Sequence, residues 1–174
     1  MPRPIINLDE LELHPWGHGV KIPGAGAVPE RFEARLGAIG TRLGAQKLAY
    51  GLTILPPGKS AFPFHNHTVN EEMFLVLEGQ GELRLGAERH ALRAGDVIAC
   101  PPGGPETAHQ IVNTSGAELK FLGVSTRSFP EVAQYPDSNK LGVLGEIPAG
   151  ADGKPRPLRF VGREQESLEY WTDE

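Results

Sequence analysis

The sequence predicts an all-β domain, either a sandwich or a barrel, and three observations support this prediction. Glycine (22 residues) and proline (16 residues) are frequent and are spread along the chain. They separate short apolar runs of about four to eight residues, several of which alternate apolar and polar positions. The runs recur at intervals of about 8 to 12 residues, which is typical of many short strands joined by turns.

The expected strands follow one another between residues 48 and 126. They are LAYGLTIL (48–55), EMFLVLEG (72–79), GELRLGA (81–87), HALRAGD (90–96), DVIAC (96–100), HQIVN (109–113) and LKFLGVST (119–126). Helical periodicity is weak. Residues 30–39 (ERFEARLGAI) predict one short helix, and residues 128–135 (SFPEVAQY) predict a single helical turn. Neither segment could support a parallel α/β sheet.

We expect three segments along the chain: an N-terminal arm at residues 1–45, a β core at residues 46–127 and a C-terminal extension at residues 128–174. The arm contains HPWGHGVKIPGAGAVP (14–29), and the extension contains IPAGADGKPRPLRF (147–160). Both stretches are too rich in Gly and Pro to predict regular structure. Each segment could pack on the core or on a second subunit.

Charge and composition exclude several classes of partner. The formal net charge is -5, and no basic stripe is present that would neutralise a row of phosphates, so we expect no nucleic-acid partner. No apolar run reaches the roughly 18 to 20 residues of a membrane span, and the first residues do not form a secretory signal. We therefore expect a cytoplasmic protein. Cys100 is the sole cysteine, and its position at the end of an apolar run predicts a buried, inert thiol.

Two histidines and a glutamate indicate a metal site. His65 and His67 are two residues apart, so in a strand their side chains share one face, with backbones about 6 to 7 Å apart. Side chains of the next strand alternate between its two faces, so one of Glu71 and Glu72 must face inward. If it is Glu72, then Phe74 and Val76 face inward with it. A buried carboxylate is costly alone, but imidazoles and a divalent cation would neutralise it.

His109 is the natural third imidazole, because it begins a later apolar strand and shares the parity of Ile111 and Asn113. Three imidazoles and one carboxylate suit a divalent transition metal such as Fe, Mn, Ni, Co, Cu or Zn better than Mg or Ca. An octahedral ion with these four ligands would keep two positions open for substrate, oxygen or water.

Together these residues resemble the two sequence motifs of the cupin superfamily. The first motif is matched by Gly58, His65, His67, Glu72 and Gly79, and its spacing selects Glu72 over Glu71. The second motif is matched by Gly95, Pro101, Gly103, His109 and Asn113. Two spacings depart from the family pattern: six residues separate Gly58 from His65, and the insertion GPETA (104–108) lengthens the loop before His109.

The resemblance implies a double-stranded β-helix (jelly-roll) barrel, often dimeric, with one metal ion inside. It assigns His65, His67, Glu72 and His109 as the ligands. We expect a metal-dependent cupin that acts on a small organic molecule, either as a dioxygenase or as a metal-assisted isomerase or lyase. A non-catalytic metabolite-binding or sensory cupin and a storage or structural barrel are the alternatives. No catalytic residue beyond the ligands is assigned, and Phe74 and Val76 are expected around the ion. Residues 73–77 are apolar on both faces, which favours a homodimer.

Overall fold

The structure is a computed structural model that describes residues 4–24, 26–148 and 153–173. Within these ranges it is nearly all β, which confirms the predicted fold class, and its one α-helix is the four-residue α1 (Gly40–Leu43). Four short 3-10 helices lie at Leu8–Glu10, Pro105–Thr107, Pro136–Ser138 and Glu164–Glu166. The strands are β1 (His14–Gly17), β2 (Glu33–Ala38), β3 (Leu48–Leu55), β4 (Asn66–His67), β5 (Glu72–Glu78), β6 (Gln80–Leu85), β7 (Glu88–Arg93), β8 (Val97–Cys100), β9 (His109–Val112), β10 (Leu119–Thr126), β11 (Glu131–Tyr135), β12 (Lys140–Ile147) and β13 (Arg156–Gly162).

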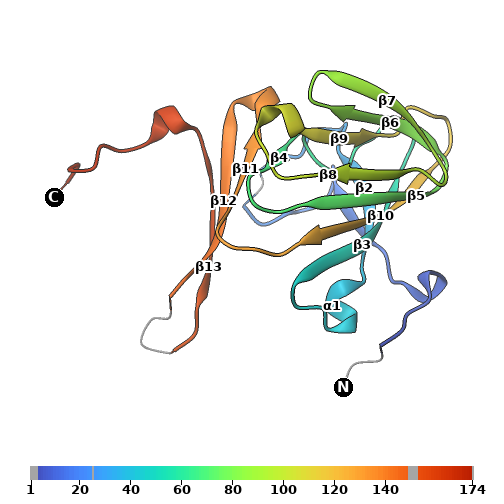
Figure 1. Ribbon diagram of the computed structural model, residues 1–174, viewed down its shortest axis with the longest axis horizontal. Helices are drawn as coiled ribbons and strands as arrows, with labels where there is room; N and C mark the ends of the chain where they lie inside the picture. Colours follow the sequence, from blue (N-terminus) through green and yellow to red (C-terminus); the bar gives the residue numbers. More distant parts are fainter. Residues whose placement is uncertain (1–3, 25, 149–152, 174) are drawn as a thin grey trace.

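Two sheets enclose the core of the barrel (Figure 1). The larger sheet has six strands in the order β1-β2-β3-β10-β5-β8, and the smaller has the order β7-β6-β9. Buried side chains from both sheets meet between them, including Leu55 and Leu119 from the larger sheet and Ile111 from the smaller. A third sheet, β13-β12-β11-β4, lies beside the barrel. This arrangement is the double-stranded β-helix that the sequence predicts.

The motif glycines serve turns of this barrel. Gly79, between β5 and β6, has a φ of +84°, and a Cβ at this position would lie 2.3 Å from the carbonyl oxygen of Glu118. Gly58 also has a positive φ, +74°. Side chains disfavour this backbone conformation, so glycine is suited to both turns. The glycines of the motif therefore shape the chain around the site and do not take part in its chemistry.

The short helix predicted at residues 30–39 is wrong, because most of this segment is strand β2. Phe32 and Ala34 are buried while the residues between and beside them are more exposed, which is the period of two that a strand shows. The apolar positions Phe32, Leu36 and Ile39 also fit helical spacing. Pairing with β1 on one side and β3 on the other selects the strand, so tertiary context overrides the local pattern.

The helical turn predicted at residues 128–135 is also wrong. These residues contain β11, which pairs with β12 along one edge and with β4 along the other. Glu131 and Ala133 alternate with more exposed residues and are 1% and 4% exposed. The partner strand β4 lies far back along the chain, so the local sequence does not reveal the pairing.

The Gly- and Pro-rich stretches contain more regular structure than expected. Within residues 14–29, His14–Gly17 form β1, and within residues 147–160, Arg156 begins β13, which pairs with β12. Residues 149–152 of the second stretch lie outside the described residues. Both terminal segments thus contribute strands to the sheets.

The outer face of the barrel is covered in part by the chain's own N-terminal segment. Leu11 packs with Leu52 and Ile54 of β3 in a second apolar cluster. Leu77 of β5 and Leu122 of β10 contribute to the same cluster from their outward faces. The sequence predicts a dimer because residues 73–77 are apolar on both faces. Their outer face is partly buried within one chain.

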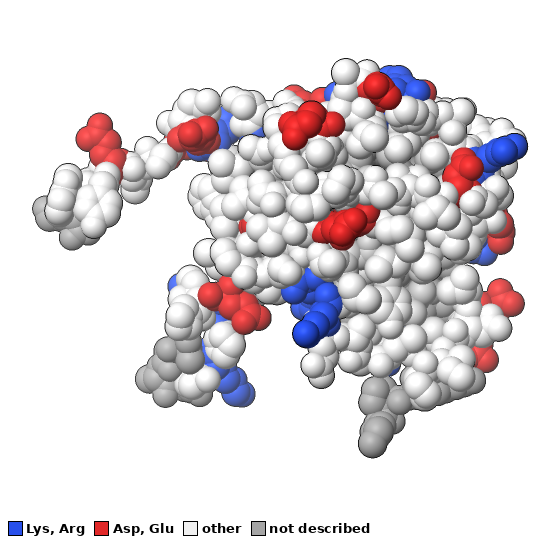
Figure 2. Space-filling view, viewed as in Figure 1, with Lys and Arg blue, Asp and Glu red and all other residues white. Residues whose placement is uncertain are grey.

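The surface charges are mixed. Figure 2 shows Lys and Arg side chains as small separate groups among Asp and Glu, so this face has no broad basic field. None of the helices in the described ranges is long and apolar enough to cross a membrane.

The homodimer expected from the sequence stays a prediction, and the C-terminal end is its candidate contact. Leu168, Tyr170 and Trp171 are 78%, 85% and 76% exposed, and the segment that contains them extends away from the barrel (Figure 1). Exposed apolar side chains in one group favour burial against a partner. Light scattering should give twice the chain mass of 18.8 kDa. The mass of a single chain would contradict the dimer.

The reactivity of the Cys100 thiol tests whether the core buries it. Its side chain is 2% exposed, and burial, with the nearby charge of Glu72 adding to it, raises the pKa of the thiol to about 12. The reactive thiolate is therefore scarce in the folded protein at pH 8. Iodoacetamide should label Cys100 slowly in the native protein and rapidly in urea, as followed by mass spectrometry. Equal rates in both conditions would mean that Cys100 is accessible.

Candidate metal centre

Three adjacent strand segments bring the predicted site residues together. His67 belongs to β4, Glu72 is the first residue of β5, and His109 is the first residue of β9. His65 lies just before β4 and pairs with His109 through two backbone hydrogen bonds, from the His65 N–H at 3.2 Å and from the His109 N–H at 2.8 Å. The two histidines are therefore fixed as neighbours, although the sequence places them on separate motifs.

The three imidazoles converge on one carboxylate oxygen. The Nε2 atoms of His109, His67 and His65 lie 2.9, 3.4 and 3.9 Å from Oε2 of Glu72. The ligand atoms of His65, His67 and Glu72 all lie within 4.8 Å of one another. The four side chains are 4 to 18% exposed, so the cluster is largely shielded from water.

This geometry fits a metal ion. Ligand atoms about 2.0 to 2.2 Å from one transition-metal ion lie roughly 3 to 3.5 Å from their neighbours in octahedral or tetrahedral sites. Two of the three Nε2 to Oε2 distances are close to that range. Nε2 of His67 is buried and makes no hydrogen bond. An ion would accept the electron pair that this nitrogen otherwise leaves without a partner.

The pKa shifts of Glu72 and His65 also suit a ligand set. Burial disfavours the charge on Glu72, but contacts with His109 and His67 outweigh it and hold the pKa of this carboxyl well below its usual range. Burial, followed by the charge of His109, lowers the pKa of His65 to about 4. Burial also acts to lower the pKa of His67, but Glu72 and Glu131 outweigh it and raise that pKa overall. A carboxylate and neutral imidazoles are the forms that bind metals, so the pKa shifts of Glu72 and His65 favour metal binding, whereas that of His67 favours its protonated form.

In two of the imidazoles, Nδ1, the ring nitrogen that faces away from Glu72, lies close to a backbone carbonyl oxygen. Nδ1 of His65 lies 2.8 Å from the carbonyl oxygen of Pro63, and Nδ1 of His109 lies 3.3 Å from that of Thr107. An Nδ1–H that donates to each carbonyl leaves the Nε2 electron pair available to an ion, whereas without an ion Nε2–H of His109 is the donor to the Glu72 carboxylate, 2.9 Å away. Such contacts set the orientation of a histidine ligand and its tautomer.

The lengthened loop before His109 keeps that residue in the cluster. Pro105–Thr107 form a 3-10 turn, and the Thr107 hydroxyl donates to the carbonyl oxygen of Gly104 at 2.9 Å. The Gly103 N–H donates to the carbonyl oxygen of His67 at 2.8 Å. The turn thus absorbs the additional residues, and the loop is tied to the strand that carries His67.

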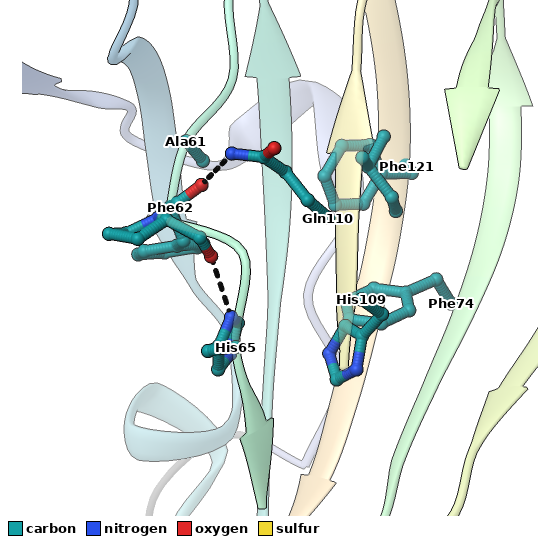
Figure 3. Close-up of a pocket in the computed structure, with 9 residues that line it drawn as sticks. Ala61, Phe62, His65, Phe74, His109, Gln110 and Phe121 are labelled. Carbon is teal, nitrogen blue, oxygen red and sulfur yellow. Dashed lines mark hydrogen bonds between the residues drawn. The ribbon is translucent and has the colours of Figure 1, made fainter. Parts of the chain in front are cut away.

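A small apolar cavity adjoins the cluster. Its volume is about 30 Å³, which is room for about two waters. Figure 3 shows His65 and His109 at one end of the cavity, with Phe74 and Phe121 along one wall. The Gln110 side-chain amide donates to the carbonyl oxygen of Phe62 at 2.8 Å. The lining residues are Ala61, Phe62, Pro63, His65, Phe74, His109, Gln110, Ile111 and Phe121, and no Lys or Arg is among them.

Phe74 lies where the sequence predicts it, in the cavity wall and 5.8 Å from the His109 ring, measured between ring centroids. Val76 shares the parity of Phe74, but it is 1% exposed within the core cluster and does not line the cavity. Glu71 is exposed. The remaining histidines, His14, His18 and His90, are exposed and lie outside the cluster.

Two residues near the cluster were missed by the sequence analysis, and both belong to β11. The Tyr135 ring stacks on His65, with centroids 6.2 Å apart and planes at 25°. Oε2 of Glu131 lies 3.7 Å from Nδ1 of His67. The alternation of Glu131, Ala133 and Tyr135 on one face of a strand was the available signal, and the predicted helical turn obscured it.

Comparisons with known proteins place this site in a family. A family model described as a cupin domain matches residues 51–125. An uncharacterised protein of Methanocaldococcus jannaschii is 36% identical over 69 residues, which are 40% of this chain and 52% of that protein. Quercetin 2,3-dioxygenase of Bacillus subtilis is 41% identical over 59 residues, which are 33% of this chain and 18% of that enzyme. The chain therefore spans about half or less of the length of these relatives.

One solved structure matches over nearly the whole chain. A sugar phosphate isomerase of the cupin superfamily from Silicibacter pomeroyi is 27% identical, with a TM-score of 0.72, over 96% of this chain and 98% of that one. The family model covers the strands that carry all four cluster residues. This chain therefore contains a cupin domain, at residues 51–125, and its fold matches that of a cupin-superfamily protein over nearly its whole length.

Proposed function

We propose that this protein is a metal-dependent enzyme that binds one divalent transition-metal ion and acts on a small organic molecule at the mouth of the barrel. The observation that supports the proposal is the convergence of three imidazole Nε2 atoms on one Glu72 oxygen, at 2.9 to 3.9 Å. His65, His67, Glu72 and His109 would hold Fe, Mn, Ni, Cu or Zn. Such an ion supplies Lewis-acid chemistry or, if it is redox-active, oxygen chemistry.

The chain's own residues would bind and orient the substrate. Phe74, Phe121 and Ile111 line the cavity next to His65 and His109, so they make that side of the cluster apolar. Gln110 is held by its hydrogen bond to Phe62 and is the one polar side chain of the lining besides His65 and His109. An apolar part of a substrate would enter the cavity, and a polar group could meet the Gln110 amide.

Oxidation of an apolar or aromatic molecule is the reaction class that this lining favours. No Lys or Arg lines the cavity, so a strongly anionic group would find no cation there. The similarity to quercetin 2,3-dioxygenase over 59 residues is consistent with this class.

Isomerisation of a sugar phosphate is the second candidate, and the similarity to the Silicibacter pomeroyi enzyme over nearly the whole chain favours it. A phosphate would require a cationic group near the cluster. Tyr135 stacks on His65 and also lines a more polar groove together with Lys140, Asn139 and Gln134. A phosphorylated substrate would place its anionic end in this groove.

Metal content tests the ligand set directly. Untagged protein purified without chelator should contain close to one transition-metal ion per chain by elemental analysis. The double variant His65→Ala/His67→Ala removes two of four ligands and should retain less than a tenth of that metal. His90→Ala, which changes an exposed histidine outside the cluster, is the control and should load fully. Full loading of the double variant would show that these residues do not hold the ion.

Turnover separates the two reaction classes. The metal-loaded protein should consume oxygen with catechols or flavonols, whereas a panel of pentose and hexose phosphates should be unchanged when followed by NMR. Isomerisation of a sugar phosphate without oxygen uptake would favour the second candidate. Tight binding of a panel member with no turnover in either assay would support the metabolite-binding alternative.

A further inference from the structure

Glu131 is a buried carboxylate that lies outside the cupin domain and beside its metal cluster. It is 1% exposed and belongs to β11, after the last matched residue of the domain. Its Oε1 accepts the backbone N–H of Thr68 at 3.0 Å and of Val69 at 3.3 Å. Its Oε2 accepts the backbone N–H of Asn70 at 2.7 Å and the Asn70 side-chain amide. Every hydrogen-bond partner is a donor, as an ionised carboxylate requires.

His67 is the one histidine of the cluster whose Nδ1 has no hydrogen bond with a backbone carbonyl oxygen. His65 and His109 each have a carbonyl oxygen within 3.3 Å of Nδ1. Both ring nitrogens of His67 are buried and make no hydrogen bond. On the Nδ1 side of the ring, the nearby acceptor is Oε2 of Glu131 at 3.7 Å, whereas Oε2 of Glu72 lies 3.4 Å from Nε2 on the other side. A shift of about half an ångström would bring the pair within hydrogen-bonding distance.

We propose that Glu131 is a positioning residue that accepts a hydrogen bond from Nδ1–H of His67 and thereby directs the Nε2 electron pair of His67 toward the ion. The effect on the ion rests on the proposed metal site, whereas the contact between the two side chains does not. A carboxylate behind a histidine ligand fixes the tautomer and makes the ligand nitrogen more basic.

The strand pairing gives Glu131 a fixed relation to His67. Ala133 of β11 pairs directly with His67 of β4, and Glu131 lies two residues along on the same face. The Thr68 N–H also donates to the carbonyl oxygen of Val132 at 3.0 Å. The carboxylate and the imidazole are therefore positioned by the same short ladder.

Support of the turn at residues 68–70 does not by itself account for a charge at this position. Neutral acceptors such as a backbone carbonyl or an amide oxygen satisfy backbone N–H groups in most turns. Burial of a carboxylate is costly, and this cost is reduced where a cationic or strongly polarised donor lies close by. His67 is that donor, and it becomes more polarised when its Nε2 binds an ion.

The tautomer of His67 tests the contact in metal-free, wild-type protein. Long-range 1H–15N correlation spectra of 15N-histidine-labelled protein distinguish a neutral ring protonated on Nδ1 from one protonated on Nε2. The neutral His67 ring should carry its proton on Nδ1. A neutral ring protonated on Nε2 would overturn the proposal, and this measurement needs no variant and no metal.

Metal affinity tests whether the contact between Glu131 and His67 strengthens binding of the ion. Glu131→Gln removes the charge while keeping the size, and it should weaken Zn²⁺ or Mn²⁺ binding about 10- to 100-fold. Asn70→Ala is the matched control, because it loosens the same turn by removing the amide bonds to Glu131 and to the Ser128 carbonyl oxygen but keeps the carboxylate beside His67. It should change affinity less than threefold. Comparison is made at a temperature where both variants are folded by circular dichroism.

An equal loss of affinity in both variants would show that Glu131 acts only by supporting the turn, and it would overturn the proposal. If Glu131→Gln does not fold, the tautomer of the wild-type protein decides. If wild-type protein binds no metal at all, the metal-dependent function fails, while the tautomer measurement still tests the contact between Glu131 and His67.

Discussion

The buried carboxylate of Glu72 is the constraint on which the site depends. It begins a strand whose neighbouring positions, Phe74 and Val76, face an apolar interior. A carboxylate in such surroundings costs several kcal/mol unless positive or polarised groups surround it. The three imidazoles, which lie on segments before and after β5, would supply these groups through an ion that they hold or through an Nε2–H such as that of His109. Their convergence on one oxygen thus stabilises the charge and fixes the mutual positions of β4, β5 and β9.

The C-terminal extension is part of this site as well as of the sheets. β4, which carries His67, pairs with β11 within the described residues, and β11 lies beyond the matched cupin domain. A second contact joins the extension to the barrel, because the Arg84 guanidinium of β6 binds the Asp137 carboxylate through two hydrogen bonds of 2.6 and 2.8 Å. Arg84 also lies over the Phe64 ring, 3.6 Å from its centroid. These contacts hold β11 against the cluster.

Much of the fold was predictable because strands have a period of two. Short apolar runs, several of them alternating, identified the seven core strands, and the motif spacing selected Glu72, whose parity is shared by Phe74 in the cavity wall. The same rule could not separate Phe74 from Val76, since both face inward and only depth in the barrel distinguishes them. The two helix predictions failed because residues 30–39 and 128–135 are strands only through their partners. Glu131 was missed for that reason: its place beside His67 depends on the register between β4 and β11.

The cavity and the groove are lined by different parts of the molecule, so under the proposed function both would contribute to the selection of a substrate. A cavity of about 30 Å³ accepts only a small portion of an organic molecule, so the rest of the substrate must lie outside it. Tyr135 stacks on His65 and is also one of the residues that line the groove. Tyr135 belongs to the extension, whereas Phe74 and Phe121 belong to the cupin domain. Under the proposed function, the barrel would therefore place the ion and the reacting end of the substrate, and the extension would shape the surface that meets the remainder.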